Sequence, residues 1–294
     1  MTRWQADALI LFAAMVWGLA FIGQATAMEH VGAMTFTGWR FAISAVVVAP
    51  FAFLEARKAA PMPKGGLNGV LLLGVVFFLA SALQQLGLKA TSVTNAGFLT
   101  ALYVVMVPVI GVLFLKHKQH PAIWIGIALS LAGTALLSGG GKLGALGQGD
   151  GLVIASALFW ALQILMISAL SQRMNRPFAL AFAQYAIVAA LGIVCGFVFE
   201  AATLPPFKEI AVELLFTGVL SGGVCFTLQA IAQRYTPASD AAILMSAEAL
   251  FAALGGAILL GDRLTPPGWT GCALILFAVL LVQLAPLWKL RRAA

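Results

Sequence analysis

The chain has 294 residues, of which 62% are hydrophobic and only 9% are charged, and its mean hydropathy is +1.02. Soluble domains carry about 25% charged residues, so this composition excludes an ordinary water-soluble protein. The formal net charge of +7 does not indicate a nucleic-acid partner, because the basic residues lie in short loops and not on one face or tail. The composition predicts a polytopic α-helical membrane protein in a lipid bilayer.

Ten apolar segments are each long enough to cross roughly 30 Å of hydrocarbon as a helix. They cover residues 5–24, 34–54, 67–88, 92–115, 121–139, 150–170, 178–199, 208–233, 238–260 and 266–288. The first could be mistaken for a signal peptide, since Ala25-Thr26-Ala27 resembles a cleavage site. Its Asp7 and Trp17 recur in the sixth segment as Asp150 and Trp160, however, so we expect it to be retained.

The chain contains two copies of one sequence unit. Residues 91–115 match residues 236–260 without gaps at an offset of 145, and the register continues beyond them. The matched pairs are Thr91 with Thr236, Asn95 with Asp240, Leu99 with Leu244, Gly111 with Gly256, Leu115 with Leu260, Pro121 with Pro266, Trp124 with Trp269 and Gly126 with Gly271. A match of this length indicates a duplication, which divides the chain into residues 1–142 and 143–294.

Each copy holds five spans, so the second must enter the membrane from the opposite side. Many secondary transporters use such inverted repeats. Twelve of the 17 Lys and Arg residues fall on the N-terminal side of the predicted membrane and five on the other. This bias places both termini in the cytoplasm. The predicted fold is an all-α polytopic membrane protein with ten transmembrane helices in two inverted five-helix repeats.

Several other features predict structure without chemistry. The Gly-rich stretch 138–149 lacks the glycine spacing and the preceding strand of a phosphate-binding loop, so we interpret it as the linker between the copies. Pro108 lies inside the fourth span and predicts a kink or a freed carbonyl. The three cysteines, Cys195, Cys225 and Cys272, lie in apolar spans and are interpreted as packing residues. No cofactor or metal is expected.

Glu248 is the most informative polar residue, because it lies near the middle of the ninth span. A carboxylate at the bilayer centre costs about 2.5–3.5 kcal/mol on insertion scales, so it must be paired, hydrogen-bonded or protonated. Two interpretations are open: a substrate or proton site in a central cavity, or an interhelical hydrogen bond that fixes packing. Tyr103 occupies the equivalent position in the first copy.

Two more matched pairs lie inside the spans. Trp17 and Trp160 are each placed well away from the interface where tryptophan usually collects, and Gln163 follows Trp160 by about one turn. They are either cavity walls or ordinary core aromatics. Gln84 and Gln229 align at the offset of 145 and either line a polar path or bridge helices.

Arg40, early in the second span, also has two interpretations. It could meet a substrate carboxylate, or it could extend its guanidinium to the outer membrane interface, and we favour the second. No nucleophile–base pair and no HExxH or GxSxG motif is present, so the sequence does not predict an enzyme.

An ordered set of weak motifs resembles the EamA-type drug/metabolite transporters over essentially the whole chain. The set is Trp17-Gly18, Trp160-Ala161, Glu248, Gly256, the run from Leu260 to Leu264, Trp269 and Gly271. Within this family the chain is most similar to the YddG-like amino-acid exporters, although Ala249 and Asp262 replace the usual Pro and Glu. The resemblance implies a basket-shaped bundle whose cavity is lined by the first, third, fourth, sixth, eighth and ninth spans.

We therefore expect a transporter of the bacterial inner membrane that exports amino acids, including aromatic ones, and similar small metabolites by alternating access. The candidate substrate-binding residues are Trp17, Gln84, Tyr103, Trp160, Gln163, Gln229 and Glu248. An alternative is efflux of cationic drugs, with Glu248 pairing with the cation among aromatic rings. Substrate identity, transport direction, ion coupling and oligomeric state stay open, and a monomer is compatible with the sequence.

Overall fold

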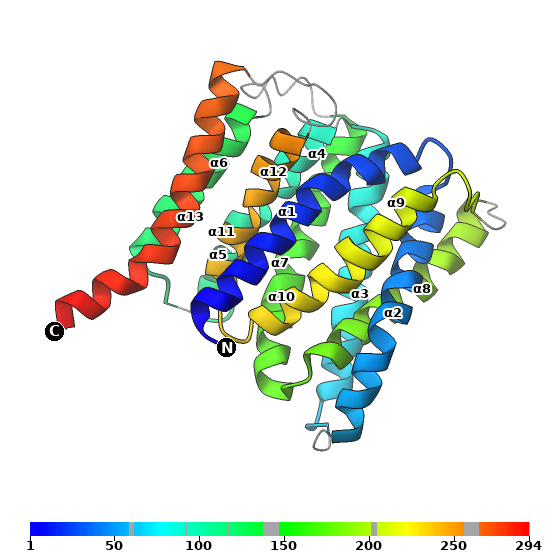
Figure 1. Ribbon diagram of the computed structural model, residues 1–294, viewed down its shortest axis with the longest axis horizontal. Helices are drawn as coiled ribbons and strands as arrows, with labels where there is room; N and C mark the ends of the chain where they lie inside the picture. The colour runs from blue at the N-terminus through cyan, green and yellow to red at the C-terminus, as the bar shows by residue number, and fades with distance from the viewer. Residues whose placement is uncertain are drawn as a thin grey trace.

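The computed structural model is an all-helical bundle that describes residues 1–58, 62–91, 93–116, 118–137, 147–200, 205–255 and 265–293 (Figure 1). In chain order the elements are α1 (Arg3–Ala27), α2 (Ala33–Lys58), α3 (Gly66–Lys89), α4 (Val93–Thr100), α5 (Tyr103–Leu113), α6 (Pro121–Leu137), α7 (Gln148–Met174), α8 (Pro177–Phe199), α9 (Ala211–Leu215), the π-helix η1 (Phe216–Cys225), α10 (Phe226–Ala232), α11 (Ala238–Met245), α12 (Ala247–Gly255) and α13 (Pro266–Ala293). Most of the predicted linker, residues 138–146, and the motif residues 256–264 lie outside the described ranges.

The ten predicted spans are confirmed. Nine helical segments of the described chain are long and apolar enough to cross a membrane, and α6 is an apolar helix of 17 residues. The fourth span consists of α4 and α5, the eighth of α9, η1 and α10, and the ninth of α11 and α12. The other spans are single helices, and most of them begin or end up to about four residues outside the predicted bounds.

The inversion of the two copies is visible where α2 packs against α8. Glu200, which follows α8, accepts hydrogen bonds from the backbone N–H groups of Met34 and Thr35 at the start of α2, both at 2.9 Å. Glu55, near the end of α2, accepts a bond of 2.8 Å from the N–H of Ala179 at the start of α8. Each helix therefore ends beside the beginning of the other, and each carboxylate satisfies free N–H groups at a helix N-terminus.

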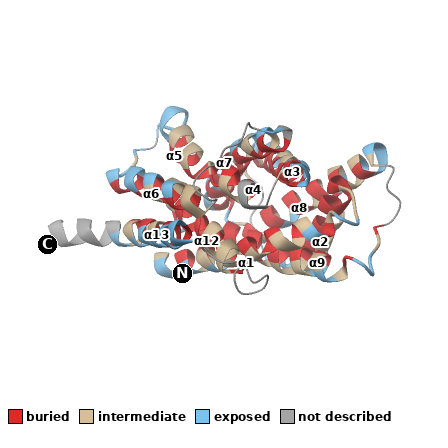
Figure 2. Cartoon of the chain, turned by 90° about the horizontal axis from the view of Figure 1, so that it is seen from above, coloured by how far each residue is buried: buried red, intermediate tan, exposed pale blue. Residues whose placement is uncertain are grey.

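Glycines allow two pairs of helices to approach closely. A Cβ atom added at Gly38 of α2 would lie 2.5 Å from the backbone nitrogen of Ile193 in α8. A Cβ atom at Gly133 of α6 would lie 2.7 Å from the carbonyl oxygen of Gly271 in α13. Small residues at such crossings are typical of membrane helix packing. The α6–α13 pair lies side by side at one edge of the bundle (Figures 1 and 2).

The fourth and ninth spans are interrupted at equivalent positions. Between α4 and α5 the N–H of Val104 bonds to the carbonyl of Ala101, and between α11 and α12 the N–H of Ala249 bonds to the carbonyl of Ser246. Both are short i→i+3 turns, which often mark hinges or functional sites within helices. Pro108 lies inside α5, after the interruption, and whether it kinks the helix stays a prediction. The ninth span is interrupted without any proline.

The eighth span contains a π-helix of ten residues, η1, which the sequence did not predict. Its backbone carbonyls bond to side chains of other helices: the Ser44 hydroxyl donates to Gly218 O at 2.7 Å, and the Trp17 indole donates to Ser221 O at 3.1 Å. Irregular helical backbone at membrane depth is tolerated when it is buried within the protein in this way. The element joins α2 and α1 to the second copy.

Candidate functional site

A central cavity lies between helices of both copies. The residues that line it are Trp17, Phe21, Gln24, Arg40, Gln84, Thr100, Tyr103, Trp160, Ile164, Ser221, Phe226, Met245 and Glu248. They come from α1, α2, α3, α4, α5, α7, η1, α10, α11 and α12. Five of the seven candidate substrate-binding residues therefore line one cavity, and these five are Trp17, Gln84, Tyr103, Trp160 and Glu248.

The cavity is small in this structure. Its volume is about 50 Å³, which is room for a few water molecules. Sites for drug-sized ligands occupy roughly 300–1,000 Å³. A ligand larger than a few water molecules therefore needs the walls of the cavity to move apart before it can enter.

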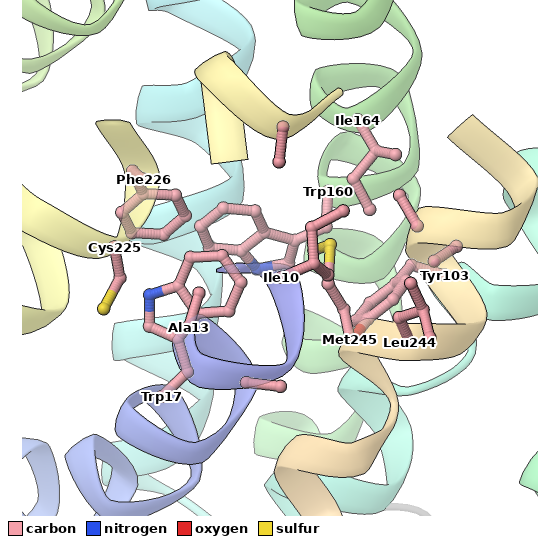
Figure 3. Close-up of a cluster of buried hydrophobic side chains, with 14 of the residues drawn as sticks. Ile10, Ala13, Trp17, Tyr103, Trp160, Ile164, Cys225, Phe226, Leu244 and Met245 are labelled. Atoms are coloured by element: carbon pink, nitrogen blue, oxygen red, sulfur yellow. The ribbon is translucent and has the colours of Figure 1, made fainter. Parts of the chain in front are cut away.

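Packed aromatic rings occupy much of the space around the cavity. Phe226 stacks on Trp160 with ring centroids 5.6 Å apart and an interplanar angle of 2°, and its ring lies 4.6 Å from that of Trp17 (Figure 3). Phe77 meets both Phe226 and Trp160 edge to face. Phe226, which the sequence analysis did not single out, therefore joins the matched tryptophans of the two copies.

The carboxylate of Glu248 contacts the phenol of Tyr103, and both residues line the cavity. The Tyr103 hydroxyl donates a hydrogen bond of 3.1 Å to Oε1 of Glu248. Tyr103 is the first residue of α5 and Glu248 the second residue of α12, so each directly follows the interruption of its span. Gly18 of α1 lets α12 approach here, since a Cβ atom at Gly18 would lie 2.4 Å from the carbonyl oxygen of Glu248.

A second polar group is built around Gln84. The indole N–H of Trp160 donates to Oε1 of Gln84 at 3.1 Å, and Nε2 of Gln84 donates to the hydroxyl of Thr100 at 3.3 Å. All three side chains are buried and line the cavity. Trp17, by contrast, uses its indole N–H for the carbonyl of Ser221 in η1. The matched tryptophans are thus held by different partners, which makes the cavity asymmetric.

Gln163 and Gln229 do not line the cavity. Nε2 of Gln229 donates to Oε1 of Gln163 at 3.2 Å, and Nε2 of Gln163 donates to Oε1 of Gln184 at 3.4 Å. All three amides are completely buried. The chain they form bridges α7, α8 and α10 beside the cavity, which corresponds to the helix-bridging interpretation. A role of these two residues in substrate binding stays a prediction.

Arg40 is buried and lines the cavity, so the expectation that it extends to the membrane interface is wrong. Only 4% of the residue is exposed. It lies seven residues into α2, which is roughly 10 Å of helix from the end of that element. The guanidinium carbon lies 4.7 Å from the ring centre of Phe41 and 5.8 Å from that of Phe36.

The two ends of the bundle carry equivalent Thr–Asp hydrogen bonds. At the end where the chain begins, the Thr236 hydroxyl donates to Oδ1 of Asp7 at 2.5 Å. At the opposite end, the Thr91 hydroxyl donates to Oδ1 of Asp150, also at 2.5 Å. These four residues are aligned by the internal repeat, which by itself predicts no contact between them. Their equivalence follows from the repeat and places one matched contact at each membrane surface.

The Thr236–Asp7 contact has an arginine beside it. Arg3 lies 3.5 Å from Oδ2 of Asp7 and also pairs with Asp240. The cavity-lining residues of α1 begin at Trp17, and Ile10 and Ala13, which precede it, are completely buried. The cavity is therefore separated from this end by packed side chains and by charges.

Within the described residues, no three His, Cys, Asp or Glu side chains are grouped so that they could hold a metal ion. The cavity instead offers one carboxylate, one guanidinium, amides and aromatic faces. Such a set can bind a small polar or zwitterionic molecule with an apolar side chain.

A model of the EamA-like transporter family matches the chain twice, over residues 4–139 and 147–284. An uncharacterized transporter of Archaeoglobus fulgidus is 33% identical over 282 residues, which cover 96% of this chain and 87% of that protein. The uncharacterized inner membrane transporter YicL of Salmonella typhimurium is 27% identical, with 94% of each chain covered. A solved crystal structure with 20% identity has the same fold, with a TM-score of 0.78 over 96% of this chain and 97% of that one.

Proposed function

Since the chain belongs to the EamA-like transporter family, we propose that it exports amino acids, including aromatic ones, and similar small metabolites by alternating access. The observation that carries this proposal is the composition of the central cavity. Aromatic walls, an amide and a carboxylate meet in one space lined by both copies. The similarity of the sequence motifs to YddG-like amino-acid exporters supports the same substrate class and the direction of transport.

In this proposal, the aromatic rings and the polar groups have different tasks. Trp17, Trp160 and Phe226 supply broad apolar faces that accept side chains of different shape. Gln84 and Glu248 supply hydrogen-bond and charge partners for the polar head, with Glu248 suited to an ammonium group. Because specificity comes from a few polar groups in a largely apolar pocket, several amino acids can share the site.

Transport in either direction requires the cavity to open to one end at a time. The matched Thr–Asp contacts at the two ends are both formed in this structure. We infer that each opens in turn as the two copies move, since equivalent contacts at opposite ends can exchange roles in an inverted repeat. The interrupted spans α4–α5 and α11–α12 are suited to act as the hinges. The excess of positive charge in the loops at the Asp7 end supports a cytoplasmic location for that end.

Efflux of cationic drugs is a second candidate, favoured by one observation. Glu248 is buried beside aromatic rings, which is the setting in which proteins bind organic cations. The guanidinium of Arg40 in the same cavity opposes this candidate, because it repels a ligand that carries only positive charge. A zwitterion satisfies both groups, and this favours amino acids.

The test is uptake into proteoliposomes of the purified full-length protein, with a panel of labelled amino acids and a quaternary ammonium dye. We expect saturable flux of several amino acids, at least tenfold weaker in Trp160→Ala. The matched control is Trp269→Ala, which removes an indole that is 58% exposed on α13 and should leave the flux unchanged. Dye transport without amino-acid flux would contradict the proposal and support drug efflux.

A further inference from the structure

Arg40 carries a positive charge that the described chain does not neutralise. Only 4% of the residue is exposed, and its Nε lacks a hydrogen-bond partner. No ion pair or hydrogen bond joins the guanidinium to any residue within the described ranges. The cation is therefore buried at membrane depth without a counter-charge from the parts of the chain that the structure shows.

An unpaired cation inside the membrane is expensive, and such residues are usually paired or face a water-filled cavity. The rings of Phe36 and Phe41 compensate part of the charge through cation–π contacts. Aromatic faces do not replace the directed hydrogen bonds that the guanidinium N–H donors require. Among the described residues, no anionic group is thus paired with Arg40.

The cavity provides the place for such an acceptor. Arg40 lines the same small space as Glu248, and the two residues come from α2 and α12 in different copies. The two side chains make no ion pair with each other in this structure. Because both groups line one small cavity, a single small molecule that enters when the walls move apart can approach both.

We propose that the guanidinium of Arg40 is an anion site that binds the carboxylate of the transported molecule. The proposal rests on the proposed amino-acid transport and names the residue that selects for a carboxylate. Arg presents a planar set of donors that matches a carboxylate in a bidentate manner. An amino acid would place its carboxylate at Arg40 and its ammonium group towards Glu248, with its side chain between the aromatic rings.

An inorganic anion such as chloride is the other candidate for the anion that binds at Arg40. A bound chloride would neutralise Arg40 without contacting the substrate. The two sources differ in one measurable respect: a substrate carboxylate competes with chloride at Arg40, whereas a structural chloride would be required for tight substrate binding.

The experiment measures the affinity of two matched ligand pairs for the full-length protein in detergent, by titration calorimetry and by ligand-induced thermal shift. The pairs are L-phenylalanine with phenethylamine and L-leucine with isopentylamine. Each amine keeps the side chain and the ammonium group and lacks only the carboxylate. The variants are Arg40→Met, which removes the charge at similar length, and Arg40→Lys, which keeps the charge without the planar donor set.

The wild-type protein should bind each amino acid roughly 10- to 100-fold more tightly than its amine, as expected for a hydrogen-bonded charge pair. Arg40→Met should abolish this preference by weakening amino-acid binding, with the affinity for the amines unchanged or higher. Arg40→Lys should retain part of the preference. In chloride-free gluconate buffer, the affinity for the amino acids should be equal or higher.

Three results would overturn the inference while leaving amino-acid transport intact. The first is an Arg40→Met protein that binds the amino acids as tightly as the wild type. The second is equal weakening of amino acids and amines in both variants, which would show a role in packing only. The third is loss of amino-acid binding in gluconate buffer, which would assign the site to chloride. If the wild-type protein binds the amines and no amino acid, the proposed function itself fails.

The stability of the ligand-free Arg40→Met protein gives an independent check. If the guanidinium of Arg40 serves to bind a ligand and has no charged partner in the ligand-free protein, it should not be needed for folding. The midpoint of thermal unfolding should therefore be equal to or higher than that of the wild type. A large fall in this midpoint in both Arg40→Met and Arg40→Lys would show that Arg40 holds the bundle together, which contradicts the inference.

Discussion

The phenol of Tyr103 donates a hydrogen bond of 3.1 Å to the carboxylate of Glu248, and the two residues are 145 positions apart, which is the offset of the internal repeat. Equivalent positions of the two copies therefore touch each other at the central cavity. Such a contact places the pair close to the axis that relates the copies. A motion of the two copies that opens one end of the bundle and closes the other must therefore act on this contact.

Tyr103→Phe should leave Glu248 without its only hydrogen-bond donor in the described chain. Loss of a bond to a buried carboxylate costs about 1–3 kcal/mol. We expect amino-acid affinity to change by roughly 5- to 100-fold with little change in the helical circular dichroism spectrum. The matched control is Tyr235→Phe, since Tyr235 is 39% exposed and lies at the end of the bundle away from the cavity. Equal effects of both substitutions would contradict the assigned role.

Glu248→Gln tests whether this carboxylate carries a proton. The variant keeps the size and the acceptor for Tyr103 but cannot ionise. If Glu248 is the carrier, amino-acid flux in proteoliposomes should lose its dependence on a pH gradient, while exchange at equal pH continues. A flux that responds to the gradient as strongly in the variant as in the wild type would exclude Glu248 from that role.

Phe226→Leu should widen the cavity, because the removed ring stacks on Trp160 and lies against Trp17. We expect relative affinity to shift towards the largest substrates, so that the ratio of tryptophan to alanine binding rises. The substitution should cost up to about 2 kcal/mol of stability, since it removes part of a buried side chain. Binding of the panel by calorimetry measures the shift. A uniform loss for all ligands would indicate general damage.

The charged contacts at the two ends predict opposite effects on access. Asp240→Asn weakens the pairing with Arg3 and should favour opening at the end with Asp7, whereas Asp150→Asn removes the acceptor charge opposite Thr91 and should favour the other end. The measurement is labelling of Ile10→Cys, which is completely buried beneath the first end, by a membrane-impermeant thiol reagent in a background without native cysteines. Labelling from that side should rise in Asp240→Asn and fall in Asp150→Asn. Changes of the same sign would contradict alternating roles.

The two carboxylates of the α2–α8 pair should contribute unequally to stability. Glu200 accepts bonds from two N–H groups and from the Thr35 hydroxyl at 2.8 Å, whereas Glu55 has one short bond to Ala179 and a longer one of 3.5 Å to Phe178. Loss of a helix cap typically costs about 0.5–2 kcal/mol. Glu200→Ala should therefore lower the unfolding midpoint more than Glu55→Ala does. The reverse order in a thermal scan would contradict this geometry.

The architecture could be predicted because hydropathy and repetition are both directly readable from the residues. Ten apolar segments limit the chain to membrane helices, and an odd number of spans per copy requires inversion. The matched pair Tyr103 and Glu248 was also visible as an alignment, and the structure shows that alignment as a contact. The repeat thus showed that the two positions are equivalent, and the contact between them is a finding of the structure.

Other features depend on tertiary packing, which the sequence pattern does not contain. The interruption at Ser246 has no proline beside it, and the π-helix η1 resembles an ordinary glycine-containing helix in its sequence. Arg40 was expected at the interface because the length of its side chain permits it, yet the helices around α2 enclose it. Gln163 and Gln229 carry the same amide group as the cavity residue Gln84, but they are joined to each other by a hydrogen bond and do not line the cavity.

The most direct test of the central claim is counterflow of labelled L-phenylalanine in proteoliposomes of the full-length protein. Counterflow needs no ion gradient and requires one site that faces the two sides in turn. We predict that unlabelled phenylalanine or leucine inside the vesicles accelerates entry of the label, and that Trp160→Ala abolishes this acceleration while Trp269→Ala does not. Label entry that is absent, or that is unaffected by internal amino acids and by Trp160→Ala, would contradict transport of amino acids through the central cavity.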